Sequence, residues 1–121
     1  SIKIMNKIFN QYKIKEFDII IDDGSHNLSD IMNGLKIYFK YLKKKGLYII
    51  EDFKYPNYYT YNNNIDHILM DEVFKNLKIK KIFNSNILTE KEQLDLMNEI
   101  HKIEIYKGNL EDSDISFIIK G

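Results

Sequence analysis

The sequence predicts an α/β fold with two parallel strands early in the chain and an antiparallel pair at its end. Two apolar runs, residues 19–21 and 47–50, each lead into two carboxylates. One amphipathic stretch separates the runs, which is the pattern of a strand, a crossover helix and a parallel strand. Near the C-terminus, apolar and polar residues alternate over 103–105 and 115–119, which indicates an antiparallel hairpin or meander.

The composition is that of one domain, expected to comprise residues 1–121, because domains usually contain about 100–150 residues. Hydrophobic residues make up 44% of the chain, enough for a core. Cysteine is absent, which excludes disulfides and thiolate metal sites. No apolar run approaches the ~20 residues that span a bilayer, and no signal-peptide segment is evident. We therefore expect no membrane association and a cytoplasmic location.

The charge pattern argues against a nucleic-acid partner. The chain carries 18 basic and 18 acidic residues, and every basic residue is a lysine. Arginine makes most specific guanine contacts and most bidentate phosphate contacts. Its absence lowers the expectation of sequence-specific nucleic-acid binding.

The first predicted elements are a helix and a buried strand. Apolar residues at positions 4, 8, 9 and 12 suit one face of a helix over 2–14. Residues 19–21 are three consecutive isoleucines, which is typical of a strand covered on both faces. Gly24 then permits a tight turn with a positive φ.

The crossover helix is predicted to begin at Asn27 or Ser29, either of which can cap it. Apolar residues recur from there to Leu42 at three- and four-residue spacing. Lysines 43–45 are expected in the last helical turn, where cations favour the helix dipole, and Gly46 at the position after the helix.

The second half is predicted to contain two more helices and a short strand. Periodic apolar residues predict a helix over 65–77, and residues 78–83 suggest a strand. Thr89 and Glu92 match a capping box that starts a helix running to about residue 99. The tyrosine-rich stretch 53–64 is interpreted equally well as a substrate lid or as a long connection.

Acidic side chains follow both predicted parallel strands. Because the carboxyl ends of neighbouring parallel strands meet at one edge of a sheet, Asp23, Glu51 and Asp52 are expected to lie together. Such carboxylates repel each other unless a cation lies between them, and Mg²⁺ is the obvious candidate. Asp22 points to the opposite strand face from Asp23 and is expected to have a different role. His26 follows closely, and its imidazole suits a general base.

These motifs resemble a known family. Residues 17–26, Phe-Asp-Ile-Ile-Ile-Asp-Asp-Gly-Ser-His, followed by residues 46–52, Gly-Leu-Tyr-Ile-Ile-Glu-Asp, resemble the second half of metal-dependent, S-adenosylmethionine-dependent O-methyltransferases. The likeness is greatest to the macrolide-sugar group, the mycinamicin and macrocin methyltransferases with their cephalosporin-hydroxylase-like relatives. The tail, 103–121, also resembles the closing antiparallel strands of that group.

The resemblance implies a set of roles. Asp23, Glu51 and Asp52 would hold Mg²⁺, His26 would be the base, and Asp22 would contact S-adenosylmethionine. The substrate would be a small molecule with a hydroxyl group, a sugar or another acceptor. The implied fold is the C-terminal half of a Rossmann-like class I methyltransferase sheet, with strands four and five parallel and strands six and seven as the antiparallel pair.

Part of the family pattern is missing. The family binds its cofactor mainly on the first half of the domain, through a glycine-rich loop, and no Gly-x-Gly occurs in this sequence. The chain is therefore expected to be the C-terminal part of a methyltransferase domain, inactive as 121 residues. Two alternatives stay open. Residues 19–25 also resemble the nucleotide-sugar motif of inverting family-two glycosyltransferases, although a threonine usually stands where His26 is found. A non-catalytic remnant of the methyltransferase fold is the other.

Overall fold

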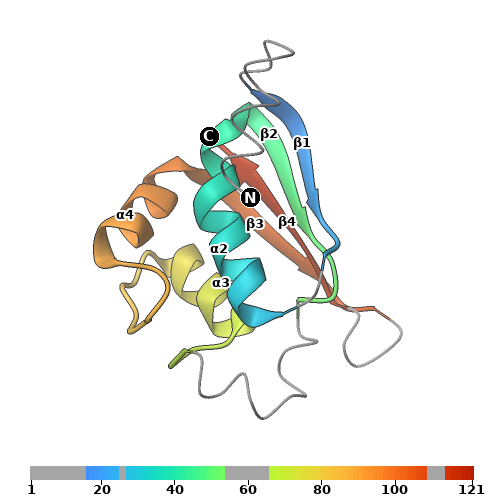
Figure 1. Cartoon of the computed structure of the whole chain (residues 1–121). Coiled ribbons are helices and arrows are strands. Elements are labelled where there is room, and N and C mark those ends of the chain that lie inside the picture. The colour runs from blue at the N-terminus through green and yellow to red at the C-terminus, as the bar shows by residue number, and fades with distance from the viewer. Residues whose placement is uncertain (1–15, 25–26, 54–65, 109–113) are drawn as a thin grey trace.

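The computed structural model describes residues 16–24, 27–53, 66–108 and 114–121, and it has two layers (Figure 1). One layer is a four-stranded sheet, and the other consists of helices that lie on the same side of that sheet. In chain order the elements are β1 (Phe17–Asp22), α2 (Leu28–Tyr38), the 3₁₀ turn η1 (Phe39–Tyr41), β2 (Leu42–Ile50), α3 (Met70–Ile79), α4 (Glu90–Glu99), β3 (Ile100–Tyr106) and β4 (Ile115–Lys120). The predicted helix over 2–14 lies outside the described residues.

The sheet has the strand order β1-β2-β4-β3. β1 and β2 are parallel, whereas β4 runs antiparallel to both β2 and β3. The α/β prediction, with parallel strands early and an antiparallel pair at the end, is therefore confirmed. No helix in the described part of the chain is long and apolar enough to cross a membrane.

Helix α2 begins as predicted but ends earlier. The Asn27 side chain accepts a hydrogen bond from the Ser29 backbone N–H at 2.9 Å, so Asn27 is the N-cap. The prediction that lysines 43–45 form the last helical turn is wrong. The helix ends at Tyr38, and η1 leads into β2, which begins at the buried Leu42.

Lysines 43–45 lie in an irregular part of β2 instead. Phe17 pairs with Leu42 and Ile19 with Leu47, so β2 has extra residues opposite β1. Lys45 has a left-handed backbone, with φ 65°. Gly46 has no positive φ and is not a helix cap. Its role is close approach, because a Cβ there would lie 2.7 Å from the Lys43 carbonyl oxygen.

The predicted strand over 78–83 is also wrong. Residues 78–79 complete α3, and Lys80 closes it in the left-handed conformation with φ 56°. Phe83 makes its backbone hydrogen bonds with the buried Gln93 side chain, which accepts from the Phe83 N–H and donates to its carbonyl, both at 2.9 Å. The Gln93 side chain therefore makes the hydrogen bonds with the Phe83 backbone that a neighbouring strand would otherwise make.

Helix α3 begins at Met70, five residues after the predicted start. Asp66 is buried before the helix and accepts hydrogen bonds from the backbone N–H groups of His67 at 2.6 Å and Asn86 at 2.8 Å, and from the Ser85 hydroxyl at 2.5 Å. These bonds attach the chain before α3 to the loop after it. Because the Asp66 side chain bonds to that loop, the residues from 66 to 69 do not form the first turn of the helix, which begins at Met70.

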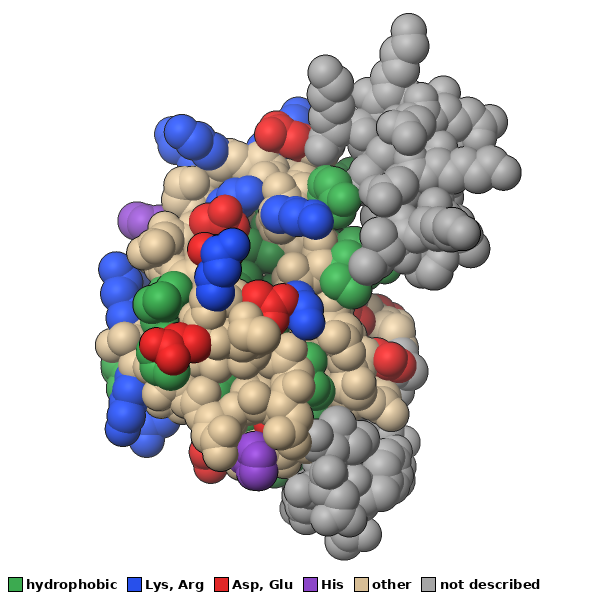
Figure 2. Space-filling model, turned by 60° about the vertical axis from the view of Figure 1, so that its left-hand side comes forward, with side chains coloured by type: hydrophobic (Ala, Val, Ile, Leu, Met, Phe, Trp, Pro, Cys, Tyr) green, Lys and Arg blue, Asp and Glu red, His purple; other side chains and the backbone are tan. Residues whose placement is uncertain are grey.

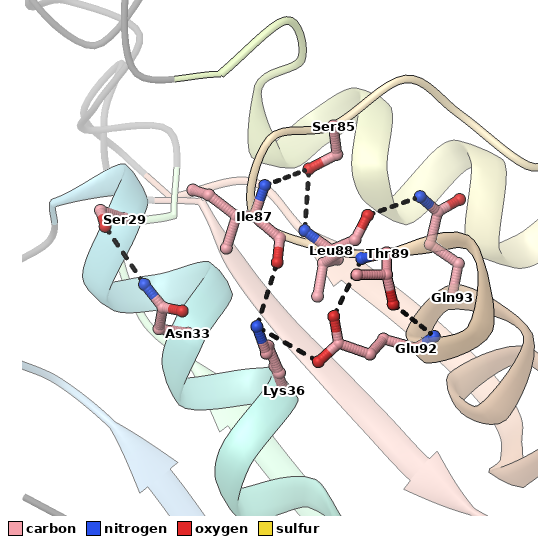
Figure 3. A network of polar contacts seen from close by, with 9 residues as sticks. All are labelled: Ser29, Asn33, Lys36, Ser85, Ile87, Leu88, Thr89, Glu92 and Gln93. Carbon is pink, nitrogen blue, oxygen red and sulfur yellow. Dashed lines mark hydrogen bonds and ion pairs between the residues drawn. The ribbon is translucent and has the colours of Figure 1, made fainter.

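Helix α4 begins with the predicted capping box (Figure 3). The Thr89 hydroxyl accepts from the Glu92 N–H at 3.2 Å, and the Glu92 carboxylate accepts from the Thr89 N–H at 2.9 Å. Lys36 of α2 joins the same network, with its ammonium 3.2 Å from both the Glu92 carboxylate and the Ile87 carbonyl. The capping box is confirmed, and through Lys36 it also ties α4 to α2.

The core lies between the sheet and the helices. One row of the helix-facing side runs through Ile20, Tyr48, Ile118 and Ile103, and the last three are at most 5% exposed. On the side of the molecule that Figure 2 shows, lysine and acidic side chains are interspersed over the surface. The helical layer thus has an apolar inner side and a polar outer side, as a two-layer fold requires.

The opposite side of the sheet, which we call the back face, is apolar as well. It is formed by Ile19, Ile21, Leu47, Ile49, Ile115, Phe117 and Ile119, and Tyr106 of β3 packs on Phe117 at the same face. The helices of the described chain all lie on the other side. Ile19 and Ile21 are 55% and 60% exposed, so within the described residues the predicted burial of β1 on both faces holds only for the face of Ile20.

Candidate functional site

The two acidic strand ends lie side by side at one rim of the sheet. Asp22 and Ile50 are register partners and the last residues of β1 and β2. The Glu51 N–H donates to the Asp22 carbonyl at 3.0 Å, which continues the pairing by one residue. Asp23 and Glu51 therefore leave neighbouring parallel strands at the same edge, where ligands of open α/β sheets bind.

The turn after β2 is held in place by a buried aromatic residue. Phe53 is fully buried and packs edge-on against Phe74, with ring centroids 4.9 Å apart. Its N–H donates to the carbonyl of the buried Asp114 at 3.3 Å. Asp52, just before it, has a left-handed backbone with φ 52°. This conformation is uncommon outside glycine, and residues that adopt it occur disproportionately at functional sites.

Asp22 faces the helical layer and lines an open cleft of about 400 Å³ between the end of β1 and α2. One of its carboxylate oxygens accepts from the Gly24 N–H at 3.3 Å. Gly24 makes this bond without a positive φ, so the turn does not use the freedom expected of it. The cleft is lined by Ile20, Ile21, Asp22, Asp23, Gly24, Asp30, Gly34, Tyr38 and Tyr48.

Tyr48 is the residue of this cleft that sequence reasoning missed. Its side chain is 1% exposed, and its hydroxyl lies 3.4 Å from the position that a Cβ on Gly34 would take. The Asp22 carboxylate lies 3.5 Å from the same position. Burial, and then the charge of Asp22 and the nearby Tyr38, raise the pKa of Tyr48, so its phenol stays protonated beside that carboxylate. The sequence offers one signal for this residue. Tyr48 lies two residues before Ile50, and residues two apart in a strand point to the same face, so Tyr48 belongs to the helix-facing side of β2.

Several predicted site residues lie outside the described part of the chain. They are His26, the proposed base, and most of the tyrosine-rich stretch 53–64. The other two histidines, His67 and His101, are both exposed.

The carboxylates are the right kind of ligand for a hard divalent cation, which prefers oxygen donors. Asp23 is exposed, whereas Glu51 and Asp52 are half-buried beside it along the rim. Within the described ranges, no three His, Asp or Glu side chains lie close enough together to hold a metal ion. The donor chemistry and the neighbouring strand ends suit Mg²⁺, and the three-carboxylate ligand set stays a prediction.

No protein-family model and no curated protein matches the chain. Among solved structures, it is similar to the MycE methyltransferase of the mycinamycin biosynthetic pathway. The complex of that enzyme with Mg, SAH and mycinamycin VI has a TM-score of 0.67 and 21% identity, over 98% of this chain and 29% of that chain. Two complexes with Mg and SAH give TM-scores of 0.63 and 0.61, at 20% and 18% identity.

The similarity confirms the fold class. The four-stranded sheet, with β1 and β2 parallel and β4 antiparallel to both β2 and β3, matches part of the fold of this solved methyltransferase. The chain spans 29% of the length of each of these solved structures.

Proposed function

We propose that this chain is the C-terminal part of an S-adenosylmethionine-dependent O-methyltransferase that uses Mg²⁺. The observation that carries the proposal is the junction of the two acidic strand ends, where the Glu51 N–H bonds to the Asp22 carbonyl. The fold supports it, because the similar structures are methyltransferase complexes that contain Mg and SAH.

Asp23, Glu51 and Asp52 are the proposed Mg²⁺ ligands. They follow directly on β1 and β2, so the sheet brings their backbones together without a long loop. Because Phe53 is anchored by its packing and its hydrogen bond, Glu51 and Asp52 just before it have less freedom to move. Bound there, Mg²⁺ would lower the pKa of an acceptor hydroxyl.

Asp22 and His26 are proposed to take two further roles in the reaction. Asp22 lies on the cleft side of β1 and would accept hydrogen bonds from S-adenosylmethionine. His26 lies three residues after Asp23 in the sequence and would take the proton of the acceptor hydroxyl as general base. The oxygen would then attack the sulfonium methyl group in line, so that the O–CH3 bond would form as the S–CH3 bond breaks and S-adenosylhomocysteine leaves. The remaining catalysis would be the positioning of the two reactants.

The proposed acceptor is a small molecule with a free hydroxyl group, such as a sugar. The solved complex with mycinamycin VI supports a small-molecule acceptor. The identity of the acceptor depends on residues beyond the rim described above.

Calorimetric titration with Mg²⁺ and S-adenosylmethionine tests the proposal. The titrated sample is the longest natural polypeptide that contains these 121 residues. We expect Asp23→Asn to weaken Mg²⁺ binding by at least about 10-fold, because it removes one anionic ligand from the set. Glu72→Gln is the matched control, since Glu72 is an exposed carboxylate in the first turn of α3. Its Mg²⁺ affinity should equal that of the unmodified protein.

Three outcomes contradict the proposal. Equal Mg²⁺ affinity in Asp23→Asn and Glu72→Gln would remove Asp23 from the ligand set. Binding of a nucleotide-sugar with no binding of S-adenosylmethionine would favour the glycosyltransferase alternative. No binding of either ligand in the longest polypeptide would favour a non-catalytic remnant. A methylation assay with His26→Ala then tests the base, and near-normal turnover would exclude it.

A further inference from the structure

The Tyr48 hydroxyl is a buried donor that the described part of the fold does not use. The Tyr48 side chain is 1% exposed, and it lines the cleft between the end of β1 and α2. Its surroundings act on it through burial and charge, and no hydrogen bond joins its hydroxyl to a residue of the described ranges. Buried polar groups in folded proteins are almost always hydrogen-bonded. A buried donor that lines a cleft and has no such partner is therefore a candidate contact for a ligand.

The space in front of Gly34 lies between this donor and an acceptor. A Cβ on Gly34 would lie 3.4 Å from the Tyr48 hydroxyl oxygen and 3.5 Å from the carboxylate oxygen Oδ2 of Asp22. The other carboxylate oxygen, Oδ1, accepts from the Gly24 N–H at 3.3 Å, so Oδ2 is the oxygen on the side of α2. A phenol of β2 and a carboxylate of β1 therefore converge on the position where Gly34 has no side chain.

Neither backbone conformation nor crowding requires glycine at position 34. Gly34 lies inside α2 and has no positive φ. The distances of 3.4 and 3.5 Å from its missing Cβ are ordinary contact distances, so alanine fits there in the cleft without ligand. Alanine also favours a helix interior more than glycine does. An open space in front of the helix backbone is what glycine provides at this position.

The lining of the cleft limits the chemistry of what it can bind. Its ionisable groups are three carboxylates and two phenols, with no lysine or histidine among the described lining residues: Asp22, Asp23, Asp30, Tyr38 and Tyr48. An anionic group is disfavoured, because it would be repelled by the carboxylates. An ammonium group supplies donors but no acceptor for the phenol proton. A group that carries a donor and an acceptor side by side, such as an alcohol hydroxyl or the edge of an adenine, satisfies both the carboxylate and the phenol.

We propose that Tyr48 and Gly34 are specificity-determining residues for the adenosine half of S-adenosylmethionine. This inference rests on the proposed function, in which Asp22 contacts that cofactor. The Tyr48 hydroxyl donates a hydrogen bond to the adenosine, Asp22 accepts one from it, and Gly34 leaves the room that it occupies. The ribose hydroxyls and the adenine edge carry donors and acceptors together, whereas the methionine half has an ammonium group without an acceptor and a carboxylate that the acidic lining repels.

Calorimetric titration with two ligands tests the inference. The ligands are S-adenosylmethionine and 5′-methylthioadenosine, which keeps the adenosine but lacks the amino acid and the sulfonium charge. The sample is the longest natural polypeptide that contains these 121 residues. Tyr48→Phe removes only the hydroxyl group, and Gly34→Ala fills the space in front of α2.

Each variant has a matched control. Tyr106→Phe also removes one phenol hydroxyl, but Tyr106 packs on Phe117 at the back face, on the other side of the sheet from the cleft. Asn33→Ala places alanine at the neighbouring position of α2, and Asn33 bonds to Ser29 and is not one of the residues that line the cleft. Both controls should bind the two ligands as the unmodified protein does.

We expect Tyr48→Phe to weaken the binding of both ligands by the same factor, about 3- to 10-fold, the usual effect of losing one neutral hydrogen bond. Gly34→Ala should weaken both by about 10-fold or more, because its methyl group takes the space of the ligand. Mg²⁺ affinity should be unchanged in both variants. Urea unfolding without ligand should show no loss of stability in either, which separates a role in binding from a role in the fold.

Four outcomes would overturn the inference. Unchanged affinity for S-adenosylmethionine in both variants would overturn it and leave the proposed function intact. Weaker binding of S-adenosylmethionine with unchanged binding of 5′-methylthioadenosine would assign the cleft to the methionine half. A loss of affinity that comes with an equal loss of stability would mean that Tyr48 and Gly34 support the fold and not the ligand. No binding of S-adenosylmethionine by the unmodified polypeptide would contradict the proposed function as well.

Discussion

Two glycines that lie against β1 lack a side chain for different physical reasons. A Cβ on Gly46 would lie 2.7 Å from the Lys43 carbonyl oxygen and 3.1 Å from that of Asp18, and these backbone atoms cannot move without disturbing the pairing of β1 with β2. A Cβ on Gly34 would lie 3.4 Å from the Tyr48 hydroxyl and 3.5 Å from the Asp22 carboxylate, which is close to ordinary contact. Gly46 is thus required by the fold, whereas Gly34 is tolerated in the interior of α2.

The two alanine variants should therefore change stability in opposite directions. We expect Gly46→Ala to lower the free energy of unfolding by about 1–3 kcal/mol, the usual effect of overpacking. Gly34→Ala should raise it by up to about 1 kcal/mol, because alanine restricts the unfolded chain and favours a helix interior. Urea unfolding of both variants measures the difference. A loss of stability in Gly34→Ala as large as that in Gly46→Ala would contradict this assignment.

At the scale of elements, the start of α4 depends on one carboxylate with two tasks. Glu92 completes the capping box with Thr89 and pairs with Lys36 of α2. Burial by itself raises the pKa of Glu92, but the hydrogen bonds from Thr89 and the contact with Lys36 outweigh burial and lower the pKa. The folded protein therefore favours the charged carboxylate.

This pKa shift predicts a pH-dependent contribution to stability. A carboxylate with a lowered pKa in the folded state contributes stability above its unfolded pKa of about 4.3, and the contribution is lost as the pH falls through the folded pKa. At pH 7 we expect Glu92→Gln to be less stable by about 0.5–1 kcal/mol, since both partners are partly exposed. Urea unfolding should show this difference shrinking toward zero near pH 3. A difference that is the same at both pH values would mean that the charge of Glu92 is not involved.

At the scale of the whole molecule, the described residues cover one side of the sheet and leave the other side uncovered. Ile118 is fully buried on the helix-facing side, whereas Ile21 on the back face is 60% exposed. In the 121-residue chain the two isoleucines should therefore respond very differently to the same substitution, although they lie in one sheet.

A lysine scan of the two faces tests this asymmetry. Ile118→Lys should lower the free energy of unfolding by more than about 3 kcal/mol, because it places a charge in the core. Ile21→Lys should change it by less than about 1 kcal/mol, and it should reduce self-association by charging an apolar edge. Chemical unfolding and analytical ultracentrifugation of the 121-residue chain measure the two effects. Similar destabilisation by both variants would contradict the one-sided covering of the sheet.

Local sequence patterns predicted the elements that depend on local interactions. The Asn27 cap and the capping box of Thr89 and Glu92 are made within four residues, so their signatures are visible in the sequence. The apolar runs that became β1 and β2 were equally clear. The acidic strand ends at Asp23 and Glu51 followed from the parallel pairing alone.

Features that depend on distant residues could not be predicted in this way. The irregular start of β2 depends on pairing with β1, and the loop at Phe83 on Gln93 ten residues later. The approach of Tyr48 and Asp22 to the same position beside Gly34 requires the packing of α2 on the sheet. In each case a tertiary contact decided between conformations that the local sequence allows equally.

The left-handed backbone of Asp52 bears on how this position evolves. Glycine would adopt the same φ of 52° without the steric cost of about 1 kcal/mol that a residue with a Cβ incurs. Selection for stability alone would therefore favour glycine here. In a set of descendants selected for folding but not for activity, position 52 should therefore drift toward glycine.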